Sequence, residues 1–301
     1  LMRRFPDRGF DVGIAEQHAV TSAAGLAIGG LHPVVAVYAT FLNRAFDQVL
    51  LDVAMHGLPV TFVLDRAGIT GPDGPSHYGI WDLSLFGAVP GMRIAAPRDA
   101  ATLRQELREA VAVSDGPTLL RFPTGSIPDA LPAVRRLPGR DGRGGLDVLV
   151  SASRRDVLMI GVGPFARLAV DAAARLGEQG YGVSVVDPRW VLPIPAELVA
   201  LASEYRVVVT VEDGICAGGF ADALARALRD AGVSTPLKDF GVPMGWHPHG
   251  SRAEILDELG LTVRHVARSV TEWISGLDHP NQETRRADRA SDAIAGRQGT
   301  A

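Results

Sequence analysis

The chain has 301 residues, of which 47% are hydrophobic and 21% charged, so it can bury a substantial core and form two domains. A net charge of −4 without a basic stripe argues against a nucleic-acid partner. The sequence also lacks a run of about 18 apolar residues, so it does not predict a membrane-spanning helix. The single cysteine, Cys216, excludes an internal disulfide framework and is typical of a cytoplasmic protein.

The first informative stretch reads FDVGIAEQHAV and runs from Phe10 to Val20. The pattern predicts a strand around Asp11, a tight turn at Gly13, and a helix that begins near Glu16 and continues to Ile28. A carboxylate in that position suits function, because a strand end is rigid and a helix start offers oriented N–H groups. An acid at a helix start is also a good electrostatic cap, so the pattern alone leaves both interpretations open.

Strands and helices then alternate as in a parallel α/β sheet. The predicted elements of this first domain are a strand over 33–38, a helix over 40–55, a strand over 59–64, a strand over 93–96, a helix over 99–114 and a strand over 118–122. Between the second and third strands lies a Gly- and Pro-rich loop, Ala67–Gly79, which carries Asp73 and His77. A long loop at a strand end is a typical place for a substrate, although Gly and Pro alone would also explain a solvated turn.

We expect a first domain over 1–125, a linker over 126–145, a second α/β domain over 146–278 and a disordered tail over 279–301. The second domain is predicted to contain strands over 156–160, 182–186 and 207–211, and helices over 165–179, 220–231, 254–259 and 263–274. The sequence GVG at 161–163 fits a tight strand-to-helix turn better than a dinucleotide site, because the third glycine of the fingerprint is Ala166. His247 and His249 are expected to be loop histidines, and Cys216 has no adjacent histidine that would make it a nucleophile.

Three segments together resemble one family: IAEQHAV, YATFLNRAFDQV and DRAGITGPDGPSHYG. They are similar to 1-deoxy-D-xylulose-5-phosphate synthases, which are thiamine-diphosphate enzymes with a transketolase-like architecture. The resemblance covers about residues 1–275 and implies a pyrimidine-binding domain followed by a transketolase-type C-terminal domain. It further implies decarboxylation of pyruvate and transfer of the two-carbon unit to D-glyceraldehyde 3-phosphate, a step that feeds isoprenoid, thiamine and pyridoxal synthesis.

The resemblance also implies roles for individual residues. Glu16 would hydrogen-bond the aminopyrimidine of thiamine diphosphate and relay a proton, while Ile14 would support the bent cofactor and Phe41 would stack on its ring. The side chains expected to face the substrates are Tyr38, Arg44, Arg66, Asp73 and His77. Of these, Arg44, Asp73 and His77 are expected, with Glu16, to be catalytic. For the arginines, an ordinary surface ion pair is the alternative.

Two departures from the family pattern affect these expectations. Thr124 stands where a basic residue usually follows the Phe-Pro pair, so phosphate binding would depend more on Arg66. No GDG…N motif for Mg2+ and diphosphate is present, no metal ligands are expected in this chain, and the sequence begins at Leu1. We therefore expect an upstream domain that holds the metal, and no turnover by this chain alone. The resemblance also implies a homodimer with the cofactor between domains.

Two other interpretations remain open. The chain could be a β-subunit of a 2-oxoacid dehydrogenase or half of a split transketolase, since such chains lack the diphosphate domain. It could instead be a non-catalytic scaffold that retains family residues.

Overall fold

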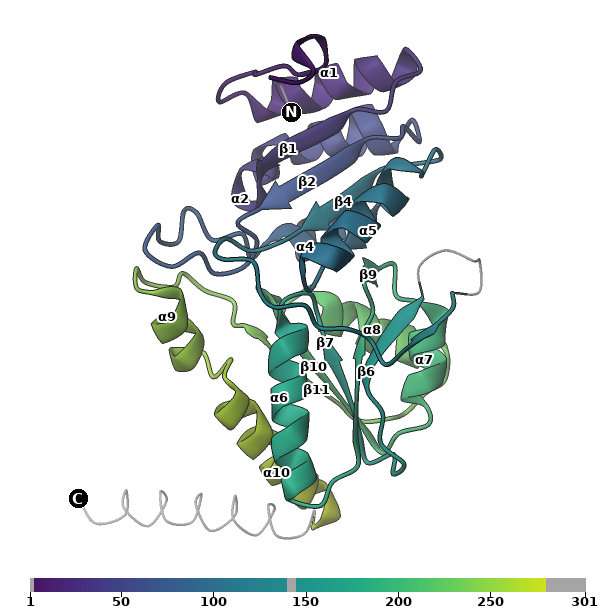
Figure 1. The fold of residues 1–301 in the computed structure, drawn as a ribbon, viewed down its shortest axis with the longest axis vertical. Coiled ribbons are helices and arrows are strands. Elements are labelled where there is room, and N and C mark those ends of the chain that lie inside the picture. The colour runs from purple at the N-terminus through teal and green to yellow at the C-terminus, as the bar shows by residue number, and fades with distance from the viewer. Residues whose placement is uncertain (1–2, 140–144, 280–301) are drawn as a thin grey trace, which may run out of the picture.

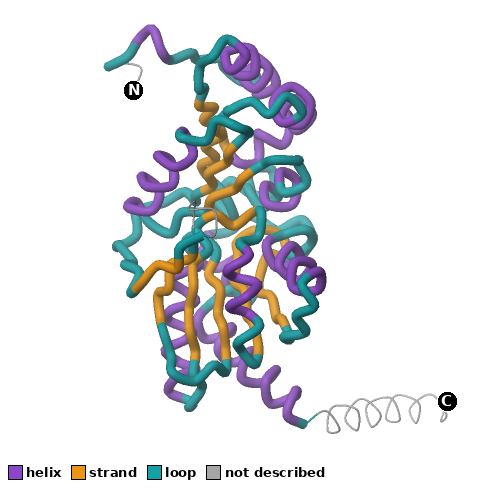
Figure 2. The backbone as a smooth tube through the Cα atoms, turned by 90° about the vertical axis from the view of Figure 1, so that its right-hand side faces the viewer, coloured by secondary structure: helices purple, strands orange, loops and turns teal. Residues whose placement is uncertain are grey.

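A computed structural model describes residues 3–139 and 145–279. Two α/β units lie end to end along the long axis, the first drawn in purple to teal and the second in green to yellow (Figure 1). The side view shows a set of strands in each unit with helices beside it (Figure 2). The expected fold class, two α/β domains with parallel or mixed sheets, is confirmed.

The first sheet has five strands in the order β1-β2-β4-β3-β9. Neighbouring strands β1/β2, β2/β4 and β4/β3 are parallel, as the alternation of strands and helices predicts. The elements of the first unit are η1 (Pro6–Arg8), α1 (Glu16–Ile28), β1 (Val34–Tyr38), α2 (Ala39–Leu42), η2 (Asn43–Ala45), α3 (Phe46–Gln48), η3 (Val49–Ala54), β2 (Thr61–Asp65), α4 (Asp82–Phe86), β3 (Arg93–Ala95), α5 (Ala100–Val111) and β4 (Thr118–Arg121).

Helix α1 packs on the sheet through small residues. Val20, Ala23, Ala24 and Ala27 are buried at the i, i+3, i+4, i+7 spacing of one helix face. Their small side chains let α1 lie close to its neighbours, which places the start of the helix, and therefore Glu16, near the carboxyl end of β1.

One strand of the first sheet comes from the second half of the chain. Strand β9 (Trp190–Leu192) pairs antiparallel with β3, joining Ile94 to Leu192 and Ala95 to Trp190. The first sheet is thus completed, at one edge, by residues about 70 positions beyond β4.

The second sheet has six strands in the order β11-β10-β7-β8-β6-β5. Its four strands from β11 to β8 are parallel, and β6 and β5 add antiparallel at one edge. The remaining elements are β5 (Arg135–Leu137), β6 (Leu146–Val150), β7 (Val157–Gly161), α6 (Phe165–Glu178), β8 (Val183–Asp187), α7 (Ala196–Ala202), β10 (Val207–Ile215), α8 (Phe220–Asp230), β11 (Leu237–Val242), α9 (Arg252–Glu258) and α10 (Val263–Asp278).

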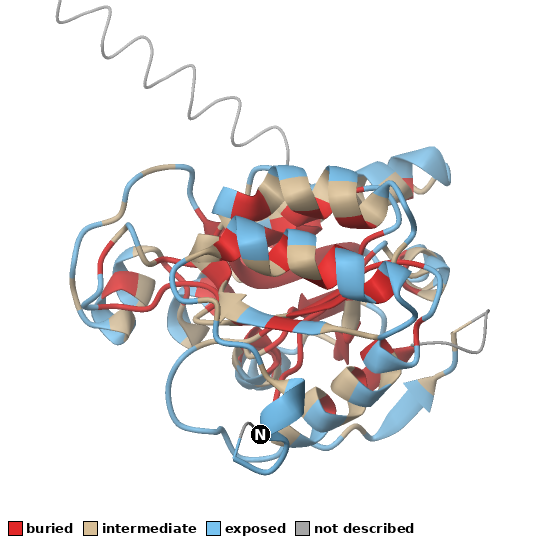
Figure 3. Cartoon of the chain, turned by 90° about the horizontal axis from the view of Figure 1, so that it is seen from above, coloured by how far each residue is buried: buried red, intermediate tan, exposed pale blue. Residues whose placement is uncertain are grey.

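Every residue of β10 is buried, as expected for a central parallel strand. Buried residues form the inner faces of the helices and the strands between them (Figure 3). No helix within the described residues is long and apolar enough to cross a membrane.

Some predicted elements are wrong. The predicted strand around Asp11 is irregular backbone, and Phe10 is 75% exposed. A strand needs a neighbour for its backbone N–H and C=O groups, and no described strand pairs with this stretch. The predicted continuous helix over 40–55 is a series of short α, 3-10 and π segments from α2 to η3.

Several elements were not predicted, namely α4, β5, β6, α7, β9 and β11. Strand β5 lies inside the expected linker, and the expected tail lies outside the described residues except for His279. The turn at 161–163 is tight, as predicted, because a Cβ on Gly161 would lie 2.5 Å from the Ala166 Cα.

Candidate active site

Glu16 is the first residue of α1 and is only 9% exposed. Its Oε2 atom is buried and has no hydrogen-bond partner among the described residues. The nearest cation is Arg44, whose Nη1 lies 3.9 Å from Oε2, while 60% of the Arg44 side chain remains exposed. A buried acceptor without a partner costs free energy, so this oxygen is suited to a ligand that brings a donor.

An aromatic cluster lies at the carboxyl end of β1. The rings of Tyr38 and Phe41 are stacked, with centroids 5.5 Å apart and planes 13° apart. The His77 and Phe41 rings form a T-shaped pair, with their centroids 5.3 Å apart and their planes at 73°. Tyr38 ends β1 and Phe41 lies in the helical turn that follows, so the strand-to-helix junction itself brings the two rings together.

Arg66 lies over the opposite end of this cluster. Its guanidinium carbon is 3.8 Å from the centroid of the Tyr38 ring, and its Nη1 lies 2.5 Å from the Asp65 carboxylate. The Arg66 backbone adopts φ +58°, a left-handed conformation that is uncommon for a residue with a side chain. Such local strain is common at functional sites and here directs the guanidinium back toward the rings.

The structure thus brings Glu16 together with Arg44, and Tyr38 with Phe41, His77 and Arg66. Ile14 is 89% exposed two residues before Glu16, and Asp73 is exposed in the loop over 67–79. Thr124 is exposed beyond the end of β4. None of these three residues forms a hydrogen bond or ion pair with another predicted site residue in the described part of the chain.

A buried charge cluster that the sequence analysis missed lies at the boundary between the units. The guanidinium of Arg121, 1% exposed at the end of β4, donates from Nε to Asp82 Oδ2 and from Nη1 to Asp213 Oδ1, each at 2.6 Å. Burial alone would lower the pKa of Arg121, but Asp213 and Asp82 raise it above its ordinary value. Arg121 therefore has a structural role as the ion-pair partner of both carboxylates.

Glu212 is buried beside this cluster and binds the start of α8. Its carboxylate accepts from the N–H groups of Phe220 at 3.0 Å and Ala221 at 2.9 Å. Burial raises the pKa of Glu212 to about 7, against the opposing effect of these hydrogen bonds.

A second buried network also joins the two units. Arg98 Nη1 donates to Asp147 at 2.7 Å and to Asp187 at 2.6 Å, and burial raises the pKa of Asp187 to about 6. Nearby, Arg189 and the Trp190 indole both donate to Glu109. The sequence signal for these buried ion pairs was a charged residue that follows an apolar run, as with Arg121, Asp187 and Asp213. The signal does not identify their partners, because these are distant in sequence.

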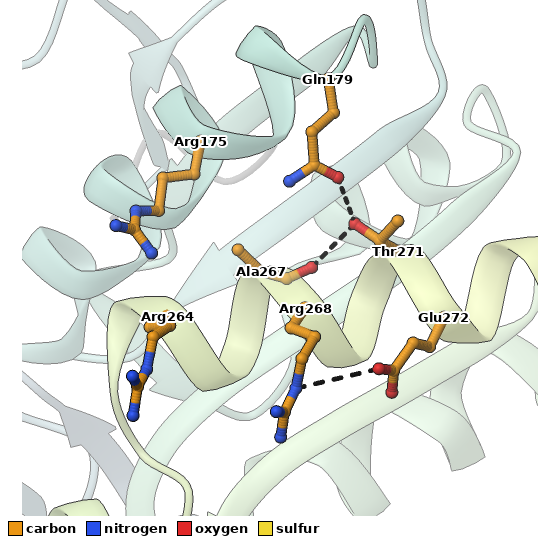
Figure 4. Close-up of a pocket in the computed structure, with 7 residues that line it drawn as sticks. All are labelled: Arg175, Gln179, Arg264, Ala267, Arg268, Thr271 and Glu272. Atoms are coloured by element: carbon orange, nitrogen blue, oxygen red, sulfur yellow. Dashed lines mark hydrogen bonds and ion pairs between the residues drawn. The ribbon is translucent and has the colours of Figure 1, made fainter.

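Two surface grooves lie away from these residues. One, about 340 Å³, lies between α6 and α10 and is lined by Arg175, Arg264 and Arg268 among others (Figure 4). The other, about 600 Å³, runs along α1 beside Phe10, His18 and Leu26. Neither contains a predicted site residue. In the described ranges, no group of three or more His, Cys, Asp and Glu residues could hold a metal ion.

Comparison with known proteins agrees with this architecture. Residues 2–129 match the family described as transketolase, pyrimidine binding domain, and residues 147–266 match transketolase, C-terminal domain. A solved split-gene transketolase, described as an inactive beta4 tetramer, is 31% identical with a TM-score of 0.78, over 90% of this chain and 85% of that chain. The transketolase of Campylobacter jejuni, 19% identical with a TM-score of 0.71 over 87% of this chain and 39% of that one, shares the fold. The chain belongs to the transketolase family.

Within this class, its similarity to 1-deoxy-D-xylulose-5-phosphate synthases is confirmed. It is 60% identical to that of Mycobacteroides abscessus over 277 residues, which are 91% of this chain and 42% of the relative. It is 62% identical to that of Rhodococcus jostii over 281 residues, which are 93% of this chain and 42% of the relative. The chain therefore spans about 42% of the length of these curated relatives.

Proposed function

We propose that the protein carrying this chain is a 1-deoxy-D-xylulose-5-phosphate synthase and that this chain supplies the pyrimidine half of a thiamine-diphosphate site. The observation that carries the proposal is Glu16, a buried carboxylate at a helix start with one oxygen that lacks a partner among the described residues. A heteroaromatic ring that brings a nitrogen-bound proton would satisfy this oxygen. The stacked rings of Tyr38 and Phe41, and Arg44 beside Glu16, provide a flat and polar surrounding for such a ring.

Bound thiamine diphosphate supplies an electron sink for loss of CO2 from pyruvate and a carbon nucleophile for joining the two-carbon unit to an aldehyde. Glu16 Oε2 would hold the proton at the pyrimidine ring nitrogen, and Phe41 would pack against the ring face. Ile14, exposed just before Glu16, would be covered when the cofactor binds.

The substrate groups are assigned by their chemistry. Arg44 and Arg66 present guanidinium groups that match carboxylate or phosphate oxygens, and Arg66 is held over Tyr38. His77, whose Nδ1 lies 2.9 Å from Ser76 Oγ, has an imidazole that can donate or accept a hydrogen bond to a substrate oxygen. Asp73, exposed in the same loop, can accept from sugar hydroxyls.

Magnesium does not fit the described residues, because they contain no suitable group of ligands. We therefore propose that another part of the protein holds the metal together with the diphosphate. A homodimer and a cytoplasmic location belong to the same proposal and are supported by the resemblance and by the single cysteine.

The second candidate is half of a split transketolase. It is favoured by the 85% coverage of the solved split-gene chain, whereas the curated synthases are about twice as similar in sequence. The two candidates differ in the donor that they use, since only the synthase releases CO2 from pyruvate while forming a sugar phosphate.

The deciding experiment measures products. The whole protein, with thiamine diphosphate and Mg2+, receives pyruvate and D-glyceraldehyde 3-phosphate, or ketose and aldose phosphates in a parallel reaction. Deoxyxylulose phosphate from the first mixture, lost in Glu16→Ala, supports the proposal. Product from the second mixture alone supports the split transketolase, and no product from either supports a non-catalytic scaffold. The 301-residue chain alone is expected to form no product.

A further inference from the structure

The loop that carries Asp73 and His77 is closed at its root. Gly68 N–H donates to Gly79 O at 2.7 Å, and Gly79 N–H donates to Gly68 O at 2.9 Å. The loop over 68–79 therefore leaves and re-enters the first unit at one point. In Figure 1 it projects from the end of β2 and lies beside the segment that leads into α9.

Three contacts fasten this loop to the second unit. The Arg252 guanidinium donates to the Ile69 carbonyl. The Tyr78 hydroxyl lies 2.6 Å from Pro248 O, and His249 Nδ1 lies 3.1 Å from Pro72 O. These contacts follow the loop from its beginning to the residue that immediately follows His77.

The loop backbone also lies close to the second unit at three glycines. A Cβ on Gly71 would lie 2.9 Å from the Arg252 backbone nitrogen. A Cβ on Gly68 would collide with the Asp213 carboxylate, and one on Gly74 would collide with the His249 ring. All three glycines have positive φ, between +75° and +104°, so the backbone conformation favours glycine at each, and at Gly71 the Arg252 backbone also leaves no room for a side chain.

Two residues of the second unit beside the loop, Arg252 and Asp213, lie in segments that are held by contacts of their own. Ser251 and Glu254 form a reciprocal capping box at the start of α9, and Ile255 anchors that helix at 2% exposure. Asp213 is fixed by its ion pair with Arg121. Arg252 and Asp213 therefore fix the position of the loop over 68–79.

We propose that residues 248–252, together with Asp213, are a positioning element of the second unit that sets the place of the loop, and with it the place of His77 beside Phe41 and of Asp73 in the same loop. On this inference, which rests on the proposed function, the second unit controls the affinity of the active site for the aldehyde acceptor, although residues 248–252 do not contact the acceptor themselves. Arg252 and His249 are positioning residues, because they act through the loop backbone.

The test uses the whole protein and two variants, Arg252→Met and His249→Ala. The first measurement is amide hydrogen exchange of residues 70–78, which needs no activity. We expect exchange to rise about tenfold in Arg252→Met and less in His249→Ala, because a hydrogen bond from a charged donor is the stronger one. Exchange in β1 and β2 should not change.

The second measurement compares the KM values for the two substrates. Each variant should raise the KM for the acceptor several-fold and change the KM for pyruvate much less. His247→Ala is the matched control for His249→Ala, since His247 bonds Pro243 O within its own segment. Arg226→Met, a change of an exposed arginine on α8, is the control for Arg252→Met.

Unchanged exchange in residues 70–78 of both variants would overturn the proposal, as would an equal rise over the whole protein, which indicates a general loss of stability. If the wild-type protein forms no product, the proposed function fails, and the exchange measurement alone still decides whether the second unit holds the loop. A faster-exchanging loop with unchanged acceptor KM would refute the control of affinity.

Discussion

Arg44 Nη1 lies 3.9 Å from Glu16 Oε2, near enough for charge attraction but too far for a hydrogen bond. The carboxylate oxygen therefore keeps its full capacity to accept from a ligand, although it is buried. The guanidinium is 60% exposed and can turn toward an anionic substrate without breaking a short bond. This pair joins the cofactor part of the proposed site to its substrate part.

Replacing Glu16 by Gln should lower kcat of the whole protein by about 10² or more, because an amide keeps the shape but cannot relay a proton. Product formation from pyruvate and glyceraldehyde 3-phosphate measures the effect. Glu178→Gln, at the exposed end of α6, is the control and should keep wild-type activity. Wild-type turnover in Glu16→Gln would remove Glu16 from the reaction.

The Tyr38 ring is expected to hold Arg66 for an anionic substrate. Tyr38→Leu removes the ring face under the guanidinium, and a cation–π contact of about 1–2 kcal/mol predicts a rise of roughly 5- to 30-fold in the acceptor KM. Tyr38→Phe retains the ring and should remain within about twofold of wild type. Equal defects in both variants would show that the hydroxyl, not the ring, is needed.

Arg121→Met should destabilise the fold by about 3–5 kcal/mol, since it leaves the carboxylates of Asp82 and Asp213 buried without their cation. Denaturant unfolding measures the loss. Arg226→Met breaks only an exposed pair at 3.8 Å and should cost about 0.5 kcal/mol or less. Similar losses in the two variants would contradict the structural role of the buried cluster.

Glu212 should make stability fall as pH rises from about 4.5 to 7. Burial raises its folded pKa to about 7, so the unfolded chain releases this proton first and ionisation favours unfolding over that range. The contribution is fully present below pH 4.5, the ordinary value, and at most about 3 kcal/mol is lost by pH 7.

The measurement compares unfolding free energies of wild type and Glu212→Gln at several pH values. The variant is less stable at every pH, because its amide places a donor against the N–H groups of Phe220 or Ala221. The informative quantity is the difference between the two proteins, which should shrink as pH rises. A difference that does not vary with pH would show that Glu212 stays in one ionisation state.

The sequence alone predicted the alternating α/β order and a helix that begins near Glu16, because those signals are local. The site residues proposed around Glu16 came from the family resemblance. Helix α1 has a regular apolar face, and the rings of Tyr38 and Phe41 are three positions apart at one strand-to-helix junction. The predicted strand around Asp11 failed because an extended stretch forms a strand only where a neighbouring edge accepts it, and no residue in the stretch itself records that neighbour.

The missed features depend on distant contacts. Asp82, Arg121 and Asp213 come from three separate parts of the chain, and only the assembled fold brings them within hydrogen-bond distance. The loop over 68–79 is likewise held by residues about 180 positions away in the sequence, such as Arg252. The sequence shows which charged residues follow an apolar strand, but it does not show which of them form ion pairs with one another.

The two family matches meet within residues 130–146. This boundary does not separate the two sheets, because β9, from the second match, pairs with β3 in the first. A polypeptide ending at residue 139 would leave β3 as a bare sheet edge and would strip Arg98 of Asp147 and Asp187. Its partner fragment would carry two buried carboxylates with no guanidinium from Arg98 to neutralise them. The two halves are therefore separate modules in sequence comparison, but in the structure they are joined by a strand pair and a buried ion-pair network.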